Sequence, residues 1–178
     1  MRYHDLMASS STLTLYLVRH AHAGESRPDD PDDPLRPLSR KGQGQADTLA
    51  QACTFLGIRF HRLFSSPYTR AAETAAPLTR HLRGGRVELL SELSGDDYGG
   101  LLAALHATLK TSDTTVGLVG HEPYLSGLTS LLLSGAAGRV KTRFRKGMIV
   151  RLDGPLEAGR QELHSALTPT LLKRLLER

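Results

Sequence analysis

Short apolar runs of strand length alternate along this chain with segments of helical periodicity. The clearest runs are 13–18 (LTLYLV) and 115–119 (TVGLV), and 60–64 (FHRLF) lies between them. From Ser39, which can cap a helix, to Gly57, which can end one, apolar residues recur at helical spacing. This alternation predicts an α/β fold, a three-layer sandwich in which a mostly parallel mixed sheet has helices on both faces.

The rest of the chain continues the alternation. Helices are predicted over 68–82, over 98–109 and from Pro123 to about 133, and Pro77 should kink or divide the first of them. Strands are predicted at 87–90, 147–152 and 161–166, the last two as antiparallel neighbours. A terminal helix should open at Thr168 and Pro169, because proline is favoured in a first helical turn.

The chain length of 178 residues suits one domain. We expect a flexible leader at 1–12 and a single domain at 13–178. The segment 23–38 is rich in Pro and Asp and shows no periodicity. Loops of that length in a small domain are functional lids or disordered segments.

The net charge of +5 limits the classes of partner. It suits nucleic acid, an anionic small substrate or a phosphorylated protein. Aromatic residues make up only 5%, so stacking platforms are lacking and we expect no nucleic-acid partner. No apolar run is long enough for a signal peptide or a membrane span, so we expect no membrane partner. The single cysteine, Cys53, is interpreted as a buried packing thiol, and the cytoplasm is the expected location.

Polar residues follow three of the predicted strands. The first strand ends at Arg19 and His20, the second at 65–67 (SSP) with Arg70 one helical turn on, and the third at Gly120 and His121. Ligands of open α/β sheets bind beyond the carboxyl ends of the strands, so these residues should meet in one pocket. The planar guanidinium group of arginine can donate two hydrogen bonds to phosphoryl oxygens and stays charged. Helices that begin near Pro67 and Pro123 would add backbone N–H donors. The sequence therefore predicts a phosphoryl-binding site.

Five segments resemble the histidine phosphatase superfamily, which also contains the cofactor-dependent phosphoglycerate mutases. They are LYLVRHAHA (15–23), LRPLSRKG (35–42), SSPYTRAAET (65–74), SEL (91–93) and VGHEP (119–123). The short chain, the RHA sequence and the RPLS segment are most similar to SixA-type phosphohistidine phosphatases. The resemblance implies a phosphoglycerate mutase-like fold.

The resemblance also implies roles for individual residues. His20 would be the nucleophile that accepts the phosphoryl group, and Arg19, Arg70 and a protonated His121 would hold its oxygens. Two arginines and an imidazolium can stabilise the transition state of phosphoryl transfer without a metal, so we expect no metal and no cofactor. The hydroxyl of Ser66 is a further candidate for phosphate binding.

The general acid is the least determined role. Glu92 lies where mutase-like members carry an acidic residue that protonates the leaving oxygen. A surface carboxylate with no catalytic role is the alternative interpretation of Glu92, and Asp96 and Asp97 are rival candidates.

The expected substrate is phosphohistidine on a protein. The interval between Arg70 and His121 is short, which leaves an open pocket that suits a protein surface. The alternatives are a small-molecule phosphomonoesterase acting on a sugar phosphate or nucleotide, and a non-catalytic phosphate-binding protein. The sequence does not indicate the oligomeric state.

A basic run lies late in the chain, at 139–146. Such a run is usually a solvated strand edge. If it is extended, however, Lys141, Arg143 and Arg145 share one face and form a docking surface for an acidic partner.

Overall fold

The computed structural model describes residues 12–25 and 33–177, in which one mixed sheet has the strand order β3-β2-β4-β1-β5-β6. The strands are β1 (Leu13–Arg19), β2 (Arg62–Ser65), β3 (Glu88–Leu89), β4 (Thr115–Gly120), β5 (Ile149–Gly154) and β6 (Glu162–Leu167). Neighbours from β3 to β1 are parallel, whereas β5 is antiparallel to both β1 and β6. The predicted mostly parallel mixed sheet is confirmed. The proposed leader, apart from Thr12, and residues 26–32 of the 23–38 segment lie outside the described residues.

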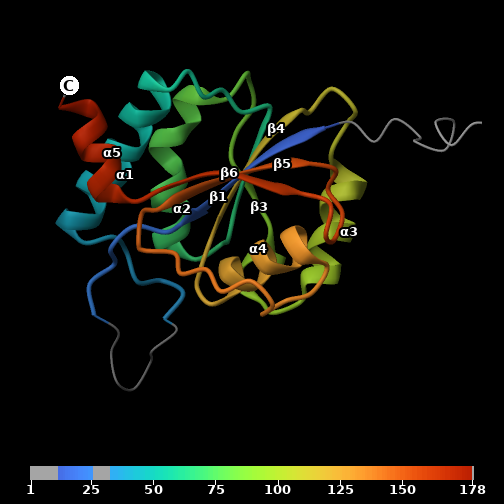
Figure 1. The fold of residues 1–178 in the computed structure, drawn as a ribbon. Coiled ribbons are helices and arrows are strands. Elements are labelled where there is room, and N and C mark those ends of the chain that lie inside the picture. Colours follow the sequence, from blue (N-terminus) through green and yellow to red (C-terminus); the bar gives the residue numbers. More distant parts are fainter. Residues whose placement is uncertain (1–11, 26–32, 178) are drawn as a thin grey trace, which may run out of the picture.

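Helices cover both faces of this sheet. They are α1 (Arg40–Phe55), α2 (Thr69–Ala75), α3 (Tyr98–Thr108), α4 (Tyr124–Ser134) and α5 (Pro169–Leu176), with 3-10 helices η1 (Ala76–His81) and η2 (Ser91–Ser94). Figure 1 shows α1, α2 and α5 on one side of the sheet and α3 and α4 on the other. The predicted three-layer sandwich is therefore confirmed.

The alternation of side chains along β1 divides the core in two. Leu15 and Leu17 pack into the cluster that contains the apolar side chains of α3 and α4. Tyr16 and Val18 point to the other face and pack into the cluster that contains those of α1 and α5. Each fully buried leucine stabilises the fold by about 1.5–3 kcal/mol. Both faces of β1 are thus buried, which explains why its sequence reads as a continuous apolar run.

Local signals set the helix boundaries. The Ser39 hydroxyl accepts from the Gly42 N–H over 3.2 Å and caps α1. Pro77, which has no N–H to donate, lies where α2 gives way to η1 and so divides the predicted 68–82 helix. The second strand begins later than predicted, since Phe60 forms only an isolated bridge with Leu82.

The structure also bears on the expectations for Cys53 and for a membrane-spanning helix. Cys53 is buried in α1, where burial raises the pKa of its thiol to about 12, so it packs as a small apolar side chain as predicted. Among the helices of the described residues, none has the length and apolar character needed to cross a membrane.

Candidate active site

The parallel pairings of β1, β2 and β4 bring three polar strand ends to one edge of the sheet. Arg19 is the register partner of Gly120, and the His20 N–H donates to the Gly120 carbonyl over 2.9 Å. The Ser66 N–H donates to the Val119 carbonyl, also over 2.9 Å. The backbone ladder itself therefore places the residues that follow each strand beside one another, as the sequence predicted.

His20 is buried, with 5% of its surface exposed, and its ring is fixed by one hydrogen bond. The Nδ1 atom lies 2.7 Å from the carbonyl oxygen of Ala21. A carbonyl oxygen can only accept, so Nδ1 carries the proton and Nε2 of the neutral ring keeps its lone pair. The ring centroids of His20 and His121 are 5.0 Å apart.

The protonation state of His20 follows from its surroundings. Burial lowers the pKa of His20 to about 3, and repulsion from His121, Arg70 and Arg19 adds to this effect. The hydrogen bond to Ala21 acts in the opposite direction but is outweighed. His20 is therefore a neutral imidazole at neutral pH, which is the nucleophilic form.

His121 lies between Ser66 and two rings. Its Nε2 is 2.8 Å from the Ser66 Oγ, and its ring centroid is 5.0 Å from that of Tyr68. Burial lowers the pKa of His121 to about 4, and the charges of Arg70 and Arg19 contribute. In the protein alone His121 is therefore a neutral imidazole at neutral pH, mainly because it is buried, and a protonated His121 stays a prediction for the state with a bound phosphoryl group.

The two arginines are held by backbone carbonyls. Arg19 donates from Nη1 to the Phe144 oxygen over 2.7 Å, and its buried Nε has no hydrogen-bond partner among the described residues. Arg70 is buried, donates from Nη1 to the Asp33 oxygen over 2.8 Å and lies 4.8 Å from the centre of the Tyr68 ring. A carbonyl fixes a guanidinium in place without cancelling its charge. The structure thus brings Arg19, His20, Arg70, His121 and Ser66 together.

Glu122 positions Arg19 indirectly, a role that the sequence reasoning missed. Its Oε1 accepts from the Phe144 N–H over 2.7 Å and from the Ser126 hydroxyl over 2.6 Å. The Phe144 carbonyl in turn accepts from Arg19. One carboxylate therefore holds the segment that orients the guanidinium, and its position inside the VGHEP motif was the available signal.

Thr74 was also missed. Its hydroxyl accepts from the Ala21 N–H over 2.9 Å and donates to the Arg70 carbonyl over 2.7 Å. It thereby ties the turn after β1, which carries His20, to the helix that carries Arg70. Its position at the end of the SSPYTRAAET motif was the available signal.

Three N–H groups at the N-termini of α2 and α4 are bonded within the protein. The Tyr68 N–H donates to the Ser66 Oγ over 3.3 Å, and the Thr69 N–H donates to the Pro34 carbonyl over 2.8 Å. At α4 the Ser126 N–H donates to Glu122 Oε2 over 3.2 Å. These three N–H groups are therefore not available to an anion, and backbone donation to a phosphoryl group by other residues of these turns stays a prediction.

The three acidic candidates lie on η2 and just before α3. Glu92 is half-buried on η2, which packs beside β4, and it accepts from the Ser91 hydroxyl over 3.2 Å. Asp97 caps α3 by accepting from the Gly100 N–H over 2.9 Å, and Asp96 is exposed. In the described part of the chain, no carboxylate of these three forms a hydrogen bond with His20 or His121.

Comparison with known proteins agrees with this geometry. Residues 15–115 match the family model described as the histidine phosphatase superfamily, branch 1. An uncharacterized protein of a Picosynechococcus strain is 30% identical over 138 residues, which cover 77% of this chain and 83% of that protein. Human mitochondrial serine/threonine-protein phosphatase PGAM5 is 31% identical over 80 residues, covering 45% of this chain and 27% of that protein.

The fold is also similar to solved structures. The protein histidine phosphatase SixA complexed with tungstate superimposes with a TM-score of 0.76 at 23% identity, covering 90% of this chain and 99% of that one. Because this likeness covers 90% of the chain, it extends beyond residues 15–115, the segment that the family model matches. Since the family match spans more than half of the sequence and includes Arg19, His20 and Arg70, the chain belongs to the histidine phosphatase superfamily.

Proposed function

We propose that this protein is a phosphatase in which His20 accepts the phosphoryl group and water then hydrolyses the phosphoenzyme. The observation that carries the proposal is the neutral, buried imidazole of His20, fixed through Nδ1 to the Ala21 carbonyl. Its Nε2 lone pair would attack phosphorus as the bond to the leaving group breaks, and the leaving group would depart with that electron pair.

The neighbouring side chains would stabilise the charge of the transferred group. Arg19 and Arg70 would contact the phosphoryl oxygens, because each guanidinium keeps its charge at any working pH. His121 would acquire its proton when a phosphoryl dianion binds, since the negative charge reverses the repulsion that lowers its pKa. Ser66, 2.8 Å from the His121 Nε2, would orient that ring.

We propose phosphohistidine on a protein as the substrate. The imidazole that leaves from phosphohistidine titrates near 6.5, so near neutrality it can depart as a neutral group without an enzymic acid. This suits a site in which Glu92 forms no hydrogen bond with His20 or His121. SixA, to which the fold is similar, is described as a protein histidine phosphatase. We place the reaction in the cytoplasm, consistent with a single cysteine that is buried and unbridged.

The test is to trap the phosphoenzyme. Brief mixing with radiolabelled phosphohistidine peptide, followed by alkaline denaturation, should yield protein-bound label that is stable to alkali and labile to acid. His20→Ala should abolish both the label and turnover, whereas His164→Ala, on the exposed β6 strand, should retain both. Label that survives in His20→Ala would show that another residue is the nucleophile.

The same preparation distinguishes the substrate classes. Turnover of phosphohistidine peptide should exceed that of phosphoserine peptide, sugar phosphate and nucleotide. A wild-type protein that hydrolyses a sugar phosphate faster than phosphohistidine would instead support the small-molecule phosphatase.

A further inference from the structure

A charged segment borders the candidate active site without belonging to it. Residues 141–145, here named the basic arm, lie between α4 and β5 and outside the sheet, so the interpretation of the basic run as a strand edge is wrong. Lys141, Arg143 and Arg145 are exposed, whereas Thr142 is half-buried and Phe144 is buried. This alternation is that of an extended segment with its three cations on one side, as the sequence predicted for an extended run.

The basic arm is fixed to the site by its backbone. The Phe144 N–H donates to Glu122 Oε1 over 2.7 Å, and its carbonyl accepts from Arg19 over 2.7 Å. The Thr142 carbonyl lies 3.0 Å from the Ser126 hydroxyl, whose proton it shares with Glu122 Oε1. Because the backbone of the segment is held at both of these residues, little backbone freedom would be lost on binding.

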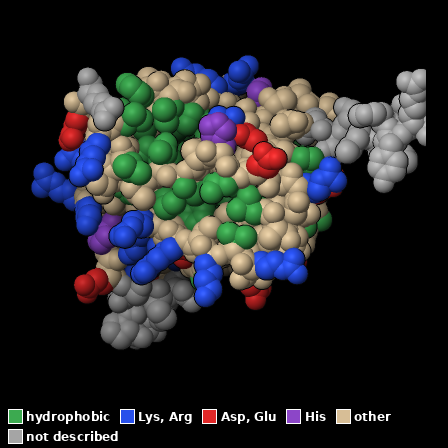
Figure 2. Space-filling view, in the orientation of Figure 1, with side chains coloured by type: hydrophobic (Ala, Val, Ile, Leu, Met, Phe, Trp, Pro, Cys, Tyr) green, Lys and Arg blue, Asp and Glu red, His purple; other side chains and the backbone are tan. Residues whose placement is uncertain are grey.

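The charges of the basic arm are not balanced by the described part of the protein. No carboxylate there forms an ion pair with Lys141, Arg143 or Arg145. Arg143 lies close enough to contribute to the lowered pKa of Arg19, and the two side chains line one depression of about 300 Å³. Figure 2 shows Lys and Arg side chains gathered along the lower left of the molecule, where the segment between α4 and β5 runs in Figure 1.

We propose that the basic arm is a docking surface for an acidic segment of the protein substrate, next to the phosphorylated residue. The inference rests on the proposed phosphatase function and adds to it the charge of the surface that the enzyme recognises. A phosphoryl group held by Arg19 would leave the flanking residues of its own chain against Arg143 and Arg145. Acidic side chains there would pair with cations that form no ion pair with a described carboxylate, which raises both the association rate and the selectivity for such substrates.

An acidic polypeptide explains the arm better than a nucleic acid does. Single-stranded nucleic acids are bound by cations interleaved with aromatic rings on which bases stack. The only aromatic side chain of the arm is Phe144, and it is buried under the backbone that carries the cations. The arm thus offers charge to carboxylates but no ring to a base.

The test measures binding apart from catalysis. Two fluorescent, unphosphorylated peptides of equal length around one histidine, one flanked by Asp and Glu and the other by Ser and Gln, are titrated with the protein while anisotropy is recorded. The acidic peptide should bind more tightly than the neutral one at low salt, and added salt should remove the difference. Arg143→Ser/Arg145→Ser should weaken acidic-peptide binding about 3- to 10-fold, the worth of two exposed ion pairs.

A matched control variant is Arg83→Ser/Arg86→Ser, which removes two exposed cations near the amino end of β3. It should leave acidic-peptide binding unchanged. Equal binding of the two peptides, an equal loss in the control variant, or tighter binding of a single-stranded oligonucleotide that the arm variant loses would each overturn the inference.

Turnover of the free amino acid phosphohistidine separates this inference from the proposed function. The arm variant should hydrolyse it within about twofold of the wild-type rate, because the arm would contact only the flanking polypeptide. A larger loss would show that the arm serves the phosphate pocket itself and would overturn docking. Failure of the wild-type protein to hydrolyse phosphohistidine would reject the proposed function. The titrations of the acidic and neutral peptides would still show whether the basic arm binds acidic segments.

Discussion

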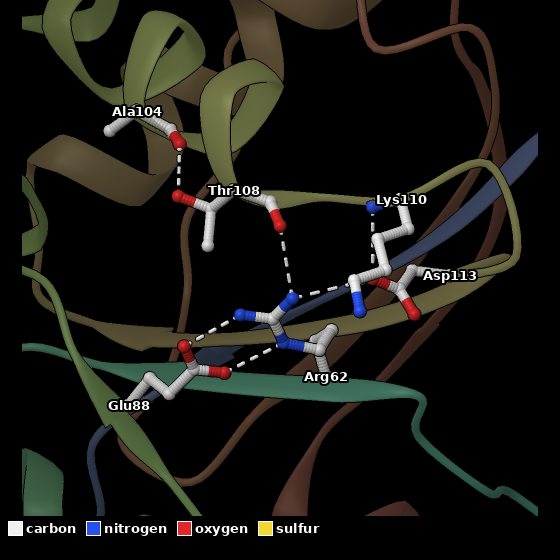
Figure 3. Close-up of polar contacts among 6 residues, drawn as sticks. All are labelled: Arg62, Glu88, Ala104, Thr108, Lys110 and Asp113. Atoms are coloured by element: carbon white, nitrogen blue, oxygen red, sulfur yellow. Dashed lines mark hydrogen bonds and ion pairs between the residues drawn. The ribbon is translucent and has the colours of Figure 1, made fainter.

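An arginine lies at each end of the sheet. One of them is bonded to carboxylates, whereas the other is bonded to a backbone carbonyl. At the amino ends of β2 and β3, Arg62 binds Glu88 through two hydrogen bonds of 2.7 and 2.6 Å. Arg62 also donates to the Thr108 carbonyl over 3.0 Å and to Asp113 over 3.4 Å (Figure 3). At the carboxyl end of β1, Arg19 donates to one carbonyl and keeps a buried Nε without a partner among the described residues.

The pKa values of the two guanidinium groups express the same difference. Hydrogen bonds to Glu88 raise the pKa of Arg62, whereas burial lowers the pKa of Arg19. A guanidinium whose donors are saturated by carboxylates stabilises the fold but has little left for a ligand. One that is positioned by a carbonyl keeps its charge available for an anion. We therefore expect the arginine at the amino end of the sheet to stabilise the fold and the arginine at the carboxyl end to bind an anion.

Removing the saturated arginine should have the largest effect on stability. Arg62→Ala leaves Glu88 and Asp113 without their cation, and we expect the free energy of unfolding to fall by about 2–3 kcal/mol. Urea denaturation measures this loss, and Arg62→Lys should recover only part of it because lysine cannot bind Glu88 through two parallel bonds. Phosphatase activity should stay within about twofold, since the cluster lies at the other end of the sheet. A large loss of activity at unchanged stability would reverse the assignment of the two ends.

Glu122 tests the carboxyl end through the segment that orients Arg19. Glu122→Ala frees Phe144 and so loosens Arg19, and we expect kcat/KM to fall about 10- to 30-fold with weaker inhibition by vanadate. Glu122→Gln keeps one oxygen that can accept from the Phe144 N–H, so it should recover most of the loss. A glutamine variant as impaired as the alanine variant would mean that the carboxylate charge, rather than the hydrogen bond, supports Arg19.

The pH dependence of stability should separate the two ends as well. The pKa of His20 is lowered to about 3 and that of His121 to about 4, below the unfolded value of about 6.5. Between these values the unfolded chain binds more protons than the folded one. The contribution of the two imidazoles is therefore full above about pH 6.5 and is lost as the pH falls, down to about 4 for His121 and about 3 for His20. The loss is about 1–2 kcal/mol per pH unit for each imidazole.

Denaturation curves at several pH values measure this slope, and His20→Asn/His121→Asn should flatten it. Arg62 stays charged throughout this range, so Arg62→Lys should leave the slope unchanged. If the double variant keeps the wild-type slope, other groups control acid stability and the lowered pKa values are not its source.

Glu92 should show the smallest effect. With phosphohistidine as substrate, Glu92→Gln should change kcat/KM by less than about threefold, because the leaving imidazole needs no enzymic acid. If Glu92 acts as a general acid on an alkyl phosphate, the same variant should lower kcat/KM for that substrate by a factor on the order of 10²–10⁴. Steady-state rates on both substrates decide between these outcomes, and a large loss on the faster substrate would support the small-molecule phosphatase.

Much of the carboxyl end of the sheet could be predicted from the sequence by local rules. Each strand reads as an apolar run, and Arg19, Ser66 and His121 stand where such a run stops. Because parallel strands end at the same edge, the order of the runs already implies that these residues meet. The sequence could not place Glu92 relative to the imidazoles, because the short η2 helix has no periodicity that would reveal it.

Other properties were decided only by the tertiary structure. The sequence separations are 26 residues between Arg62 and Glu88 and 22 between Glu122 and Phe144, and no local pattern pairs them. The neutral state of His121 likewise depends on how deeply the fold buries the ring and how near it brings Arg70. Periodicity and turn chemistry act over a few residues and so fix which side chains stand at a strand end. Hydrogen bonds and charges act through space, so the partners and protonation states of those side chains follow only from the packed chain.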